Sequence, residues 1–233
     1  MANQEENPFL DKIGARVLPE FLSLTDNPAM VEYQNHHLAG YSKMDEDGIP
    51  SREVKLVENG ILKTLLISRD PVRGVDHSTG SRHAGQAAPS NMIVTASNGL
   101  SNAELRARFL DTVKQRNRPF GILVRRMRNG NNALLAYKVF PDGHEELVRG
   151  MQFFGMNAAS FKDIAAASRE PNFLTVRYQP PRNNQVLFRN EGEENFTPVS
   201  LVVPALLFED ATMRNIRAAV PKPPAYGHPF FEK

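Results

Sequence analysis

An Asn-Gly pair between two apolar runs constrains the fold of this chain more than any other feature of its sequence. Residues Glu53–Val57 alternate between apolar and polar side chains, as in a strand with one buried face. Asn59-Gly60 follows, and a second apolar run continues over Ile61–Ser68. Both turn residues tolerate a positive φ, which a two-residue type I′ hairpin turn requires. The sequence therefore predicts an antiparallel β-hairpin at this point.

Short apolar runs separated by glycine, proline and asparagine continue along the rest of the chain. A second hairpin is expected from Phe120–Arg128 and Ala133–Phe140, which flank the sequence Asn-Gly-Asn-Asn. Single strands are predicted over Asn91–Ala96 and Leu147–Phe153, and residues 173–210 are strand-like between breaks at proline and glycine.

Two helices are expected among these strands. Ser101, with Glu104 three residues later, forms the capping-box pattern that starts a helix. The apolar residues that follow, up to about residue 117, recur on one helical face. A second short helix is predicted over Ala158–Ala167. The sequence thus predicts an α+β fold dominated by β-structure, with antiparallel sheets of hairpins and two short helices.

The two ends of the chain differ in composition from the segment between them. Residues 1–16 are mostly polar at their start and are expected to be a flexible lead-in. Residues 219–233 are rich in proline, which fixes φ and removes backbone donors, so this tail is not helical. One domain is expected over residues 17–218, with no internal repeat.

The overall charge excludes some classes of partner. The 233 residues include 28 lysines and arginines and 26 acidic residues, a net charge of +2, so charge offers no case for nucleic-acid binding. The sequence has no cysteine, which excludes disulfides, thiolate metal sites and cysteine nucleophiles. With neither a long apolar run nor a signal-type N-terminus, we expect a cytoplasmic protein without membrane contact.

The segment His77–Gly85, with the sequence HSTGSRHAG, is the strongest candidate for a functional loop. Its two histidines are compatible with a metal site, its arginine with carboxylate binding, and the whole segment with a plain polar loop. Zinc sites usually have closer ligand pairs with supporting carboxylates, and neither HExxH nor HExxxH occurs in this sequence. We therefore expect no metal site within the chain. The aperiodic stretch around it runs from about Asp70 to Ser90. Segments that long in compact domains are usually functional or disordered, and both alternatives stay open here.

Two charged clusters suggest less specific roles. Asp45–Asp47 precedes Gly48 but lacks the oxygen spacing of a calcium loop, so a solvated turn is expected. Arg125, Arg126 and Arg128 lie in a predicted strand, where alternation places the last two on one face and the first on the other. Such arginines are usually solvated or pair with acids on a neighbouring strand.

Taken in order, several segments resemble the C-terminal half of the TldD/PmbA family. These proteins are metallopeptidases, historically called modulators of DNA gyrase and assigned to peptidase family U62. The resemblance extends from about Val17 to Asp210 and implies a fold like that of the TldD/PmbA C-terminal domain. The segments that carry it are DEDG at Asp45–Gly48, LVENGILK at Leu56–Lys63, the S-x-G-x-R loop at Ser78–Arg82, the SNM sequence at Ser90–Met92, PDGHEELVRG at Pro141–Gly150 and SLVVPALLFED at Ser200–Asp210.

The resemblance implies a zinc enzyme whose metal ligands lie outside this chain. In the family, two histidines of a helical HExxxH bind zinc and the glutamate acts as general base toward a bound water. That motif precedes the region matched here, so no catalytic or metal-binding residue is assigned in this sequence. The chain alone is then expected to be inactive, and to depend on a zinc-bearing half or a homologous partner subunit in a dimer.

Two classes of function follow from the resemblance. The first is the C-terminal peptide-cleft domain of a zinc metallopeptidase in proteolysis or peptide maturation. The alternative is a non-catalytic peptide-binding or scaffold subunit that pairs with an active homologue. In both, the loop borders a cleft in which peptide lies extended, a mode that uses main-chain hydrogen bonds and an arginine for carboxylate. The residues expected to contact peptide are Ser78, Thr79, Gly80, Arg82 and His83.

Overall fold

The computed structural model describes residues 9–70, 77–128, 130–179 and 196–216. The chain divides into two compact units. The larger unit consists of Met1–Phe109 and Asn157–Asp210, and the smaller unit of Leu110–Met156 and Ala211–Lys233.

The expected lead-in is only partly among the described residues. Within it, Leu10–Lys12 forms a single 3-10 turn, and Arg16 forms an isolated β-bridge with Ile61. Residues 1–8, and the whole of the expected tail at residues 219–233, lie outside the described residues. A single domain over residues 17–218 stays a prediction.

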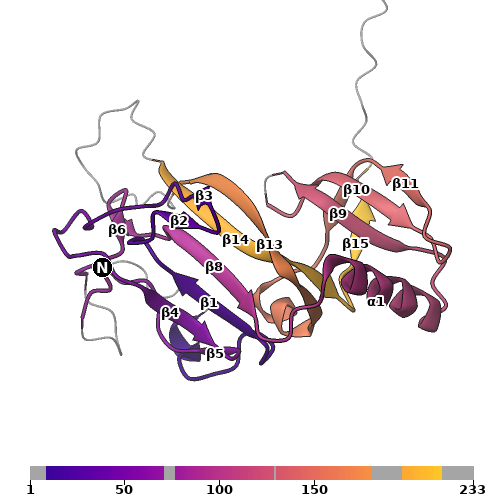
Figure 1. The fold of residues 1–233 in the computed structure, drawn as a ribbon, viewed down its shortest axis with the longest axis horizontal. Helices are drawn as coiled ribbons and strands as arrows, with labels where there is room; N and C mark the ends of the chain where they lie inside the picture. Colours follow the sequence, from indigo (N-terminus) through magenta and orange to yellow (C-terminus); the bar gives the residue numbers. More distant parts are fainter. Residues whose placement is uncertain (1–8, 71–76, 129, 180–195, 217–233) are drawn as a thin grey trace, which may run out of the picture. The chain divides into compact units, whose positions relative to one another are not determined.

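A six-stranded sheet forms the centre of the larger unit, with the strand order β13-β14-β8-β1-β4-β5 (Figure 1). All neighbouring strands pair antiparallel except β8 and β14, which are parallel. This confirms the predicted β-dominated fold with mainly antiparallel pairing. The strands are β1 (Leu22–Asp26), β4 (Val54–Glu58), β5 (Ile61–Leu62), β8 (Asn91–Ala96), β13 (Ile164–Tyr178) and β14 (Thr197–Phe208).

The hairpin predicted from Asn59-Gly60 is confirmed as β4 and β5. Asn59 and Gly60 have φ values of 48° and 78°, the left-handed values of a type I′ turn. A Cβ on Gly60 would overlap the backbone oxygen of Leu18, so this position requires glycine.

The second strand of this hairpin is shorter than predicted, because it ends at Leu62 rather than Ser68. Beyond β5, Leu65 and Leu66 pack against the apolar cluster that contains Val54. The apolar residues of this segment therefore cover one face of the sheet instead of extending its ladder.

The central sheet buries apolar side chains on both of its faces. Ile93 of β8 packs with Leu38 and Val202, whereas the adjacent Met92 packs in the cluster that contains Val54. Neighbouring residues of a strand point to opposite faces, so the two clusters lie on opposite sides of the sheet.

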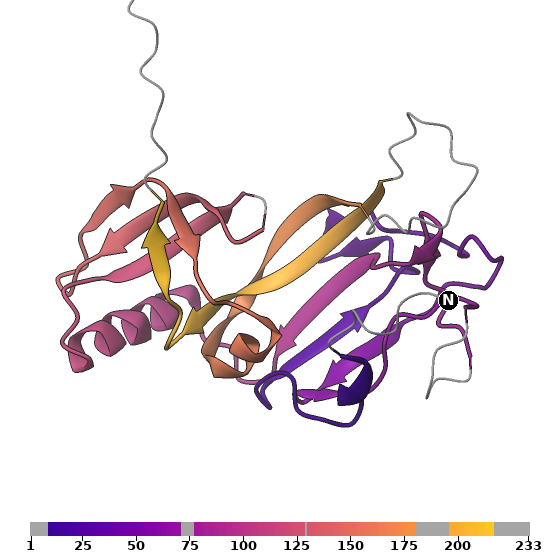
Figure 2. The same ribbon diagram turned by 180° about the vertical axis from the view of Figure 1, so that it is seen from behind.

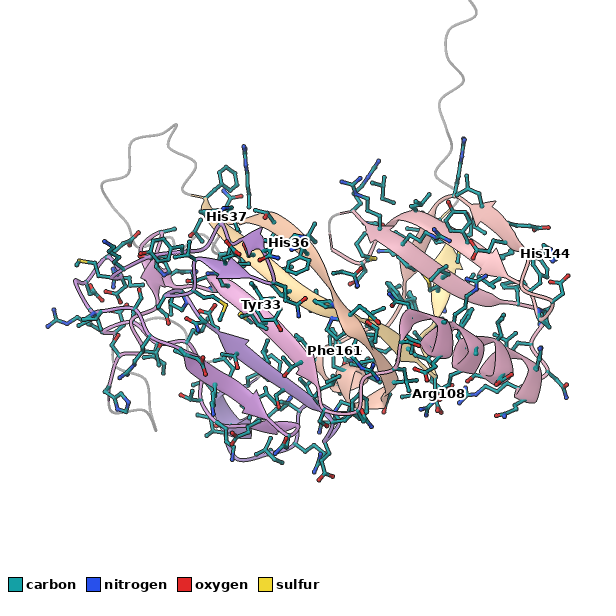
Figure 3. The ribbon with its side chains drawn as sticks, in the orientation of Figure 1. Tyr33, His36, His37, Arg108, His144 and Phe161 are labelled. Carbon is teal, nitrogen blue, oxygen red and sulfur yellow. The ribbon has the colours of Figure 1, made fainter. Side chains whose placement is uncertain are left out.

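A small hairpin of β2 (Glu32–Tyr33) and β3 (His36–His37) contributes to the cluster around Ile93. The ring of His36 stacks on Phe173 of β13, with 3.8 Å between the ring centroids. Tyr33 lies at 6.2 Å from the same phenylalanine. Figure 3 labels Tyr33, His36 and His37 of this hairpin. Figure 2 shows the long β13–β14 ribbon from behind.

The smaller unit contains a three-stranded antiparallel sheet in the order β11-β10-β9. Its strands are β9 (Gly121–Met127), β10 (Ala133–Val139) and β11 (Glu145–Val148), so the predicted second hairpin is confirmed. The single strand predicted over Leu147–Phe153 is divided. Gly150, with φ 68°, separates β11 from β12 (Met151–Phe153), which pairs instead with β15 (Met213–Asn215).

The first predicted helix is confirmed as α1 (Asn102–Gln115). Its capping box is complete: Ser101 N donates to the Glu104 carboxylate at 2.7 Å, and Glu104 N donates to Ser101 Oγ at 3.2 Å. Leu105 packs with Ala166 and Leu207, which fastens the start of the helix to β13 and β14.

The second expected helix is shorter than predicted. A 3-10 helix spans Ala158–Asp163, and β13 begins at Ile164. Ile164, Ala166 and Ala167 are buried within the larger unit as strand residues. Tertiary packing therefore overrides the helical pattern of the local sequence.

Candidate functional site

The candidate loop is anchored at Thr79, a residue that is 5% exposed. Thr79 Oγ1 accepts a hydrogen bond from Ile67 N at 2.7 Å and lies 2.9 Å from both Ile67 O and Ser81 Oγ. Thr79 N also donates to Ile67 O at 3.0 Å. The hydrogen-bonding groups of this threonine are thus used to hold the loop against the segment after β5.

Ser78 and Gly80 flank the buried threonine and are also bonded within the protein. Ser78 Oγ donates to Ile67 O at 3.2 Å and accepts from Gly80 N at 3.1 Å, while Ser78 O accepts from Arg52 Nη2 at 2.7 Å. Gly80 is buried with φ 71°, and a Cβ there would lie 2.9 Å from Pro50 O. Glycine therefore allows the close packing of two chain segments at this position.

Asp45 lies beneath the loop and is 5% exposed, which overturns the expectation of a solvated acidic turn. Its Oδ1 accepts hydrogen bonds from Asp47 N and Ile49 N, both at 2.9 Å. Its Oδ2 accepts from Arg82 N at 3.2 Å. One carboxylate thus shapes its own turn and holds the backbone of the loop 37 residues later in the chain.

Glu46 caps the β-hairpin of β6 (Arg82–His83) and β7 (Gln86–Ala87). Its two carboxylate oxygens accept hydrogen bonds from Ala84 N at 2.7 Å and Gly85 N at 2.8 Å. These turn residues have φ values of 53° and 83°, so their amides point the same way and are available to one carboxylate.

Arg82, expected to contact peptide, is paired with two carboxylates of the chain itself. Its Nε lies 3.7 Å from Asp47 Oδ1, and its Nη1 lies 3.2 Å from Asp70 Oδ2. The arginine side chain is 27% exposed, so the guanidinium remains partly accessible from solvent.

His83, the last expected contact residue, is only partly buried, but its Nε2 atom is buried and has no hydrogen-bond partner among the described residues. Burial lowers the pKa of the imidazole, and the nearby charges of Glu46 and Asp45 partly oppose this shift. The neutral ring is therefore favoured, because a buried nitrogen without a hydrogen-bond partner disfavours the charged form. The loop's other histidine, His77, is exposed.

The structure brings the five expected residues together in one anchored loop, with two of them, Thr79 and Gly80, buried behind its surface. Sequence reasoning did not assign Asp45 and Glu46 to this loop. The signal that points to them is the acidic run directly before Gly48, since side chains of this kind often accept bonds from nearby backbone amides.

The Ser90-Asn91 pair, at the end of the loop, joins it to the central sheet. Asn91 Oδ1 accepts from Gly40 N at 3.0 Å, and its Nδ2 donates to Asn27 O and Met30 O, each at 3.0 Å. Asn91 is fully buried. Its amide therefore ties the chain on both sides of the β2–β3 hairpin to the first residue of β8.

Asp26, the last residue of β1, is fully buried beside this pair. Its Oδ1 accepts from Ser90 N at 3.1 Å, while its Oδ2 has no partner within the described part of the chain. Burial raises the pKa of the carboxyl to about 6, and hydrogen bonds from the backbone of Ser90 and Asn91 limit the rise.

The sequence model of the PmbA/TldA metallopeptidase C-terminal domain matches residues 1–215. The chain therefore belongs to the PmbA/TldA family.

Individual relatives agree over shorter stretches. A metalloprotease from Methanocaldococcus jannaschii is 36% identical over 73 residues, which are 31% of this chain and 15% of that protein. A zinc metalloprotease TldD homolog from Saccharolobus solfataricus is 41% identical over 54 residues, 23% of this chain and 11% of the relative. The matched stretches are thus small parts of both relatives.

Solved structures share the fold over most of the chain. TldE from Thermococcus kodakarensis superposes with a TM-score of 0.60 at 15% identity, covering 90% of this chain and 43% of that one. A candidate modulator of a DNA gyrase from Thermotoga maritima superposes with a TM-score of 0.61 at 18% identity, covering 89% and 42%. The present chain spans less than half of each.

The zinc named for one relative has no counterpart in the residues described here. Among residues 9–70, 77–128, 130–179 and 196–216, no three His, Asp or Glu side chains gather in a way that could hold a metal ion. These side chains therefore do not fit a zinc site, and no catalytic step through zinc is derived from them. Over the same residues, no helix is long and apolar enough to cross a membrane.

Proposed function

We propose that the chain is the C-terminal peptide-cleft domain of a TldD/PmbA-type zinc metallopeptidase, acting in proteolysis or peptide maturation. The observation that carries this proposal is the match of the family's C-terminal domain to residues 1–215. The name of the zinc metalloprotease relative supports zinc as the metal of the whole enzyme.

In this proposal the loop forms one wall of the peptide cleft. Ser78, Arg82 and His83 are partly exposed and face the peptide, whereas Thr79 and Gly80 hold the loop in place. Arg82 supplies a positive charge that remains partly accessible from solvent. Such a charge is suited to a peptide, whose carboxylates accept hydrogen bonds.

The zinc ligands and the general base come from outside these 233 residues, since no HExxxH occurs in the sequence. Either a zinc-bearing half of the same protein or a homologous partner subunit in a cytoplasmic dimer supplies them. The alternative proposal is a non-catalytic peptide-binding or scaffold subunit that pairs with an active homologue. Both proposals keep the same loop and differ in whether this chain contributes to cleavage.

Zinc analysis and a peptidase assay test the proposal. The chain is measured alone and in complex with a homologous subunit that carries HExxxH, with cleavage of an unstructured peptide followed by mass spectrometry. We expect zinc and cleavage only in the complex, and a loss of cleavage when the chain in that complex carries Arg82→Ala. Zinc at one per chain together with cleavage by the chain alone would overturn it. Cleavage by the partner at the same rate without this chain would favour the alternative.

A further inference from the structure

One oxygen of Asp70 is held by two donors from the candidate loop and the segment after β5. Asp70 Oδ2 lies 3.2 Å from Arg82 Nη1 and accepts a hydrogen bond from Ser68 Oγ at 3.0 Å. A guanidinium and a hydroxyl that converge on one carboxylate oxygen form a small carboxylate receptor.

The two sides of this contact differ in how firmly they are held. Ser68 is 5% exposed, and Arg82 is fixed through its backbone N to Asp45 and through Nε to Asp47. The Asp70 side chain, by contrast, is 69% exposed. The donors therefore belong to the fixed part of the structure, while the acceptor is a solvent-exposed side chain.

The exposed position of Asp70 makes it replaceable. Ion pairs between exposed side chains contribute little to stability, because water and salt screen them and both side chains lose freedom. Ser68 and Arg82 would donate the same hydrogen bonds to any other carboxylate at that position. A carboxylate on a peptide that is held by further contacts can therefore displace Asp70 at small cost in stability.

We propose that Ser68 and Arg82 form a receptor for a carboxylate of the bound peptide, and that Asp70 occupies it when no peptide is present. This rests on the proposed peptide-binding function and adds to it a preference for substrate. The ligand carboxylate is either the free C-terminus of the peptide or an aspartate or glutamate side chain. Asp70 is then a specificity-determining residue that competes with the substrate.

The test compares the affinities of four peptides for the full 233-residue chain, alone and in complex with a homologous subunit that carries HExxxH. The probes are fluorescein-labelled heptapeptides of alternating alanine and threonine, with a free C-terminal carboxylate or a C-terminal amide. Two further amidated peptides carry one glutamate or one glutamine in the middle. Affinities are measured by fluorescence anisotropy for the wild-type chain, Asp70→Asn and Ser68→Ala.

A matched control is available in Glu58→Gln. Glu58 is also an exposed carboxylate in ion pairs of the larger unit, but its partners are Lys55 and Lys63, outside the loop. Melting temperatures of all variants show whether each is folded.

We expect Asp70→Asn to tighten binding of a carboxylate-bearing peptide about three- to tenfold, because the competing charge is removed. For the two peptides without a carboxylate, the affinity of Asp70→Asn differs from that of the wild type by less than about twofold. The affinity of Glu58→Gln for each of the four peptides also stays within about twofold of the wild-type value. Ser68→Ala weakens the carboxylate-bearing peptide and leaves the neutral one unchanged. Tightening for the free-acid peptide identifies the C-terminus as the ligand, and tightening for the glutamate peptide identifies a side chain.

Two outcomes overturn the inference, and they are distinguishable. If all four peptides bind with the same affinity to the wild-type chain and to Asp70→Asn, the carboxylate receptor is wrong while the peptide-binding function stands. If no peptide binds to any folded variant or to the chain in complex with its zinc-bearing partner, both the receptor and the proposed function are wrong.

Discussion

Two acidic turns in this chain use the same local chemistry in different surroundings. In the larger unit, Asp45 accepts bonds from the backbone N of Asp47 and of Ile49, and it is 5% exposed. In the smaller unit, Asp142 accepts a bond from His144 N at 3.1 Å, and its side chain is 69% exposed. Figure 3 labels His144 at this second turn, between β10 and β11.

The comparison shows how burial changes the role of one side chain. Away from water, a carboxylate is a favourable partner for several amides at once, and its loss leaves those amides unsatisfied. At the surface, water replaces each lost bond. We therefore expect Asp45 to organise the loop it touches, and Asp142 to affect only its own turn.

The largest expected effect is that of Asp45→Ala. The substitution removes an acceptor shared by three backbone amides, including that of Arg82. We expect the free energy of unfolding to fall by about 3 to 5 kcal/mol, and amides of residues 78–85 to exchange faster with solvent. Denaturant unfolding and hydrogen exchange measure the two effects. Unchanged exchange in the loop would show that Asp45 does not hold it.

A second large effect concerns the pH dependence of stability at Asp26. Its pKa is raised from 3.8 to about 6, so the folded state holds a proton that the unfolded state has already released. Stability from this group therefore falls as pH rises from about 4 to about 6, and stays constant above that, a loss of about 2 to 3 kcal/mol.

Asp26→Asn removes the titrating group, so its unfolding free energy should lack that fall when the two proteins are compared between pH 4 and pH 7. The measurement is a series of urea unfolding curves. If the unfolding free energies of the wild type and Asp26→Asn changed in parallel with pH, the buried carboxyl would not be the source of the pH dependence.

An intermediate effect is expected at the start of α1. Ser101→Ala removes the side-chain half of the capping box, in which Glu104 N donates to Ser101 Oγ. The expected cost is about 1 kcal/mol, smaller than at Asp45 because water replaces part of the lost bond. Thermal unfolding measures it, with Ser97→Ala, an exposed serine outside the helix, as control. If Ser101→Ala lost as much stability as Asp45→Ala, the proposed link between burial and the strength of a polar contact would be wrong.

The smallest effect is expected at Asp142. A hydrogen bond from the backbone N of His144, and then one from its ring, lower the pKa of the Asp142 carboxyl. Any stability that this carboxylate contributes is therefore lost only as the pH falls toward and below the ordinary pKa of an aspartate. At pH 7, Asp142→Asn should shift the melting temperature by less than about 2 °C. A larger shift would show that solvent exposure does not limit the contribution of Asp142 to stability.

The elements set by local chemistry were predictable from sequence. Asn59-Gly60 encodes its turn through backbone preferences, and Ser101 with Glu104 encodes the start of α1 through paired hydrogen bonds. Where an element packs against residues distant in the sequence, its ends were not predictable. The segment after Leu62 covers the core instead of extending the hairpin, and Ile164–Ala167 joins a strand despite its helical pattern.

The candidate site was predictable as a segment but not as an arrangement. Its glycines, hydroxyls and arginine pointed to residues 78–83, and the order of motifs pointed to the family. The partners of these residues come from elsewhere in the chain: Asp45, Glu46 and Asp70 bind the loop across 12 to 39 residues. Pairs of residues that are distant in the sequence and meet only in the fold are not visible in a single sequence.

By itself, the sequence determined the β-rich class of the fold, two of its turns, its helix start and its family, because each depends on neighbouring residues or on a motif order. Only the tertiary structure decided which polar groups are buried and what they bind. It turned Asp45 from a solvated acid into the anchor of a loop, and it placed Arg82 between two carboxylates. The physical reason is that burial and long-range contacts set the strength of polar interactions, and neither is a local property of the chain.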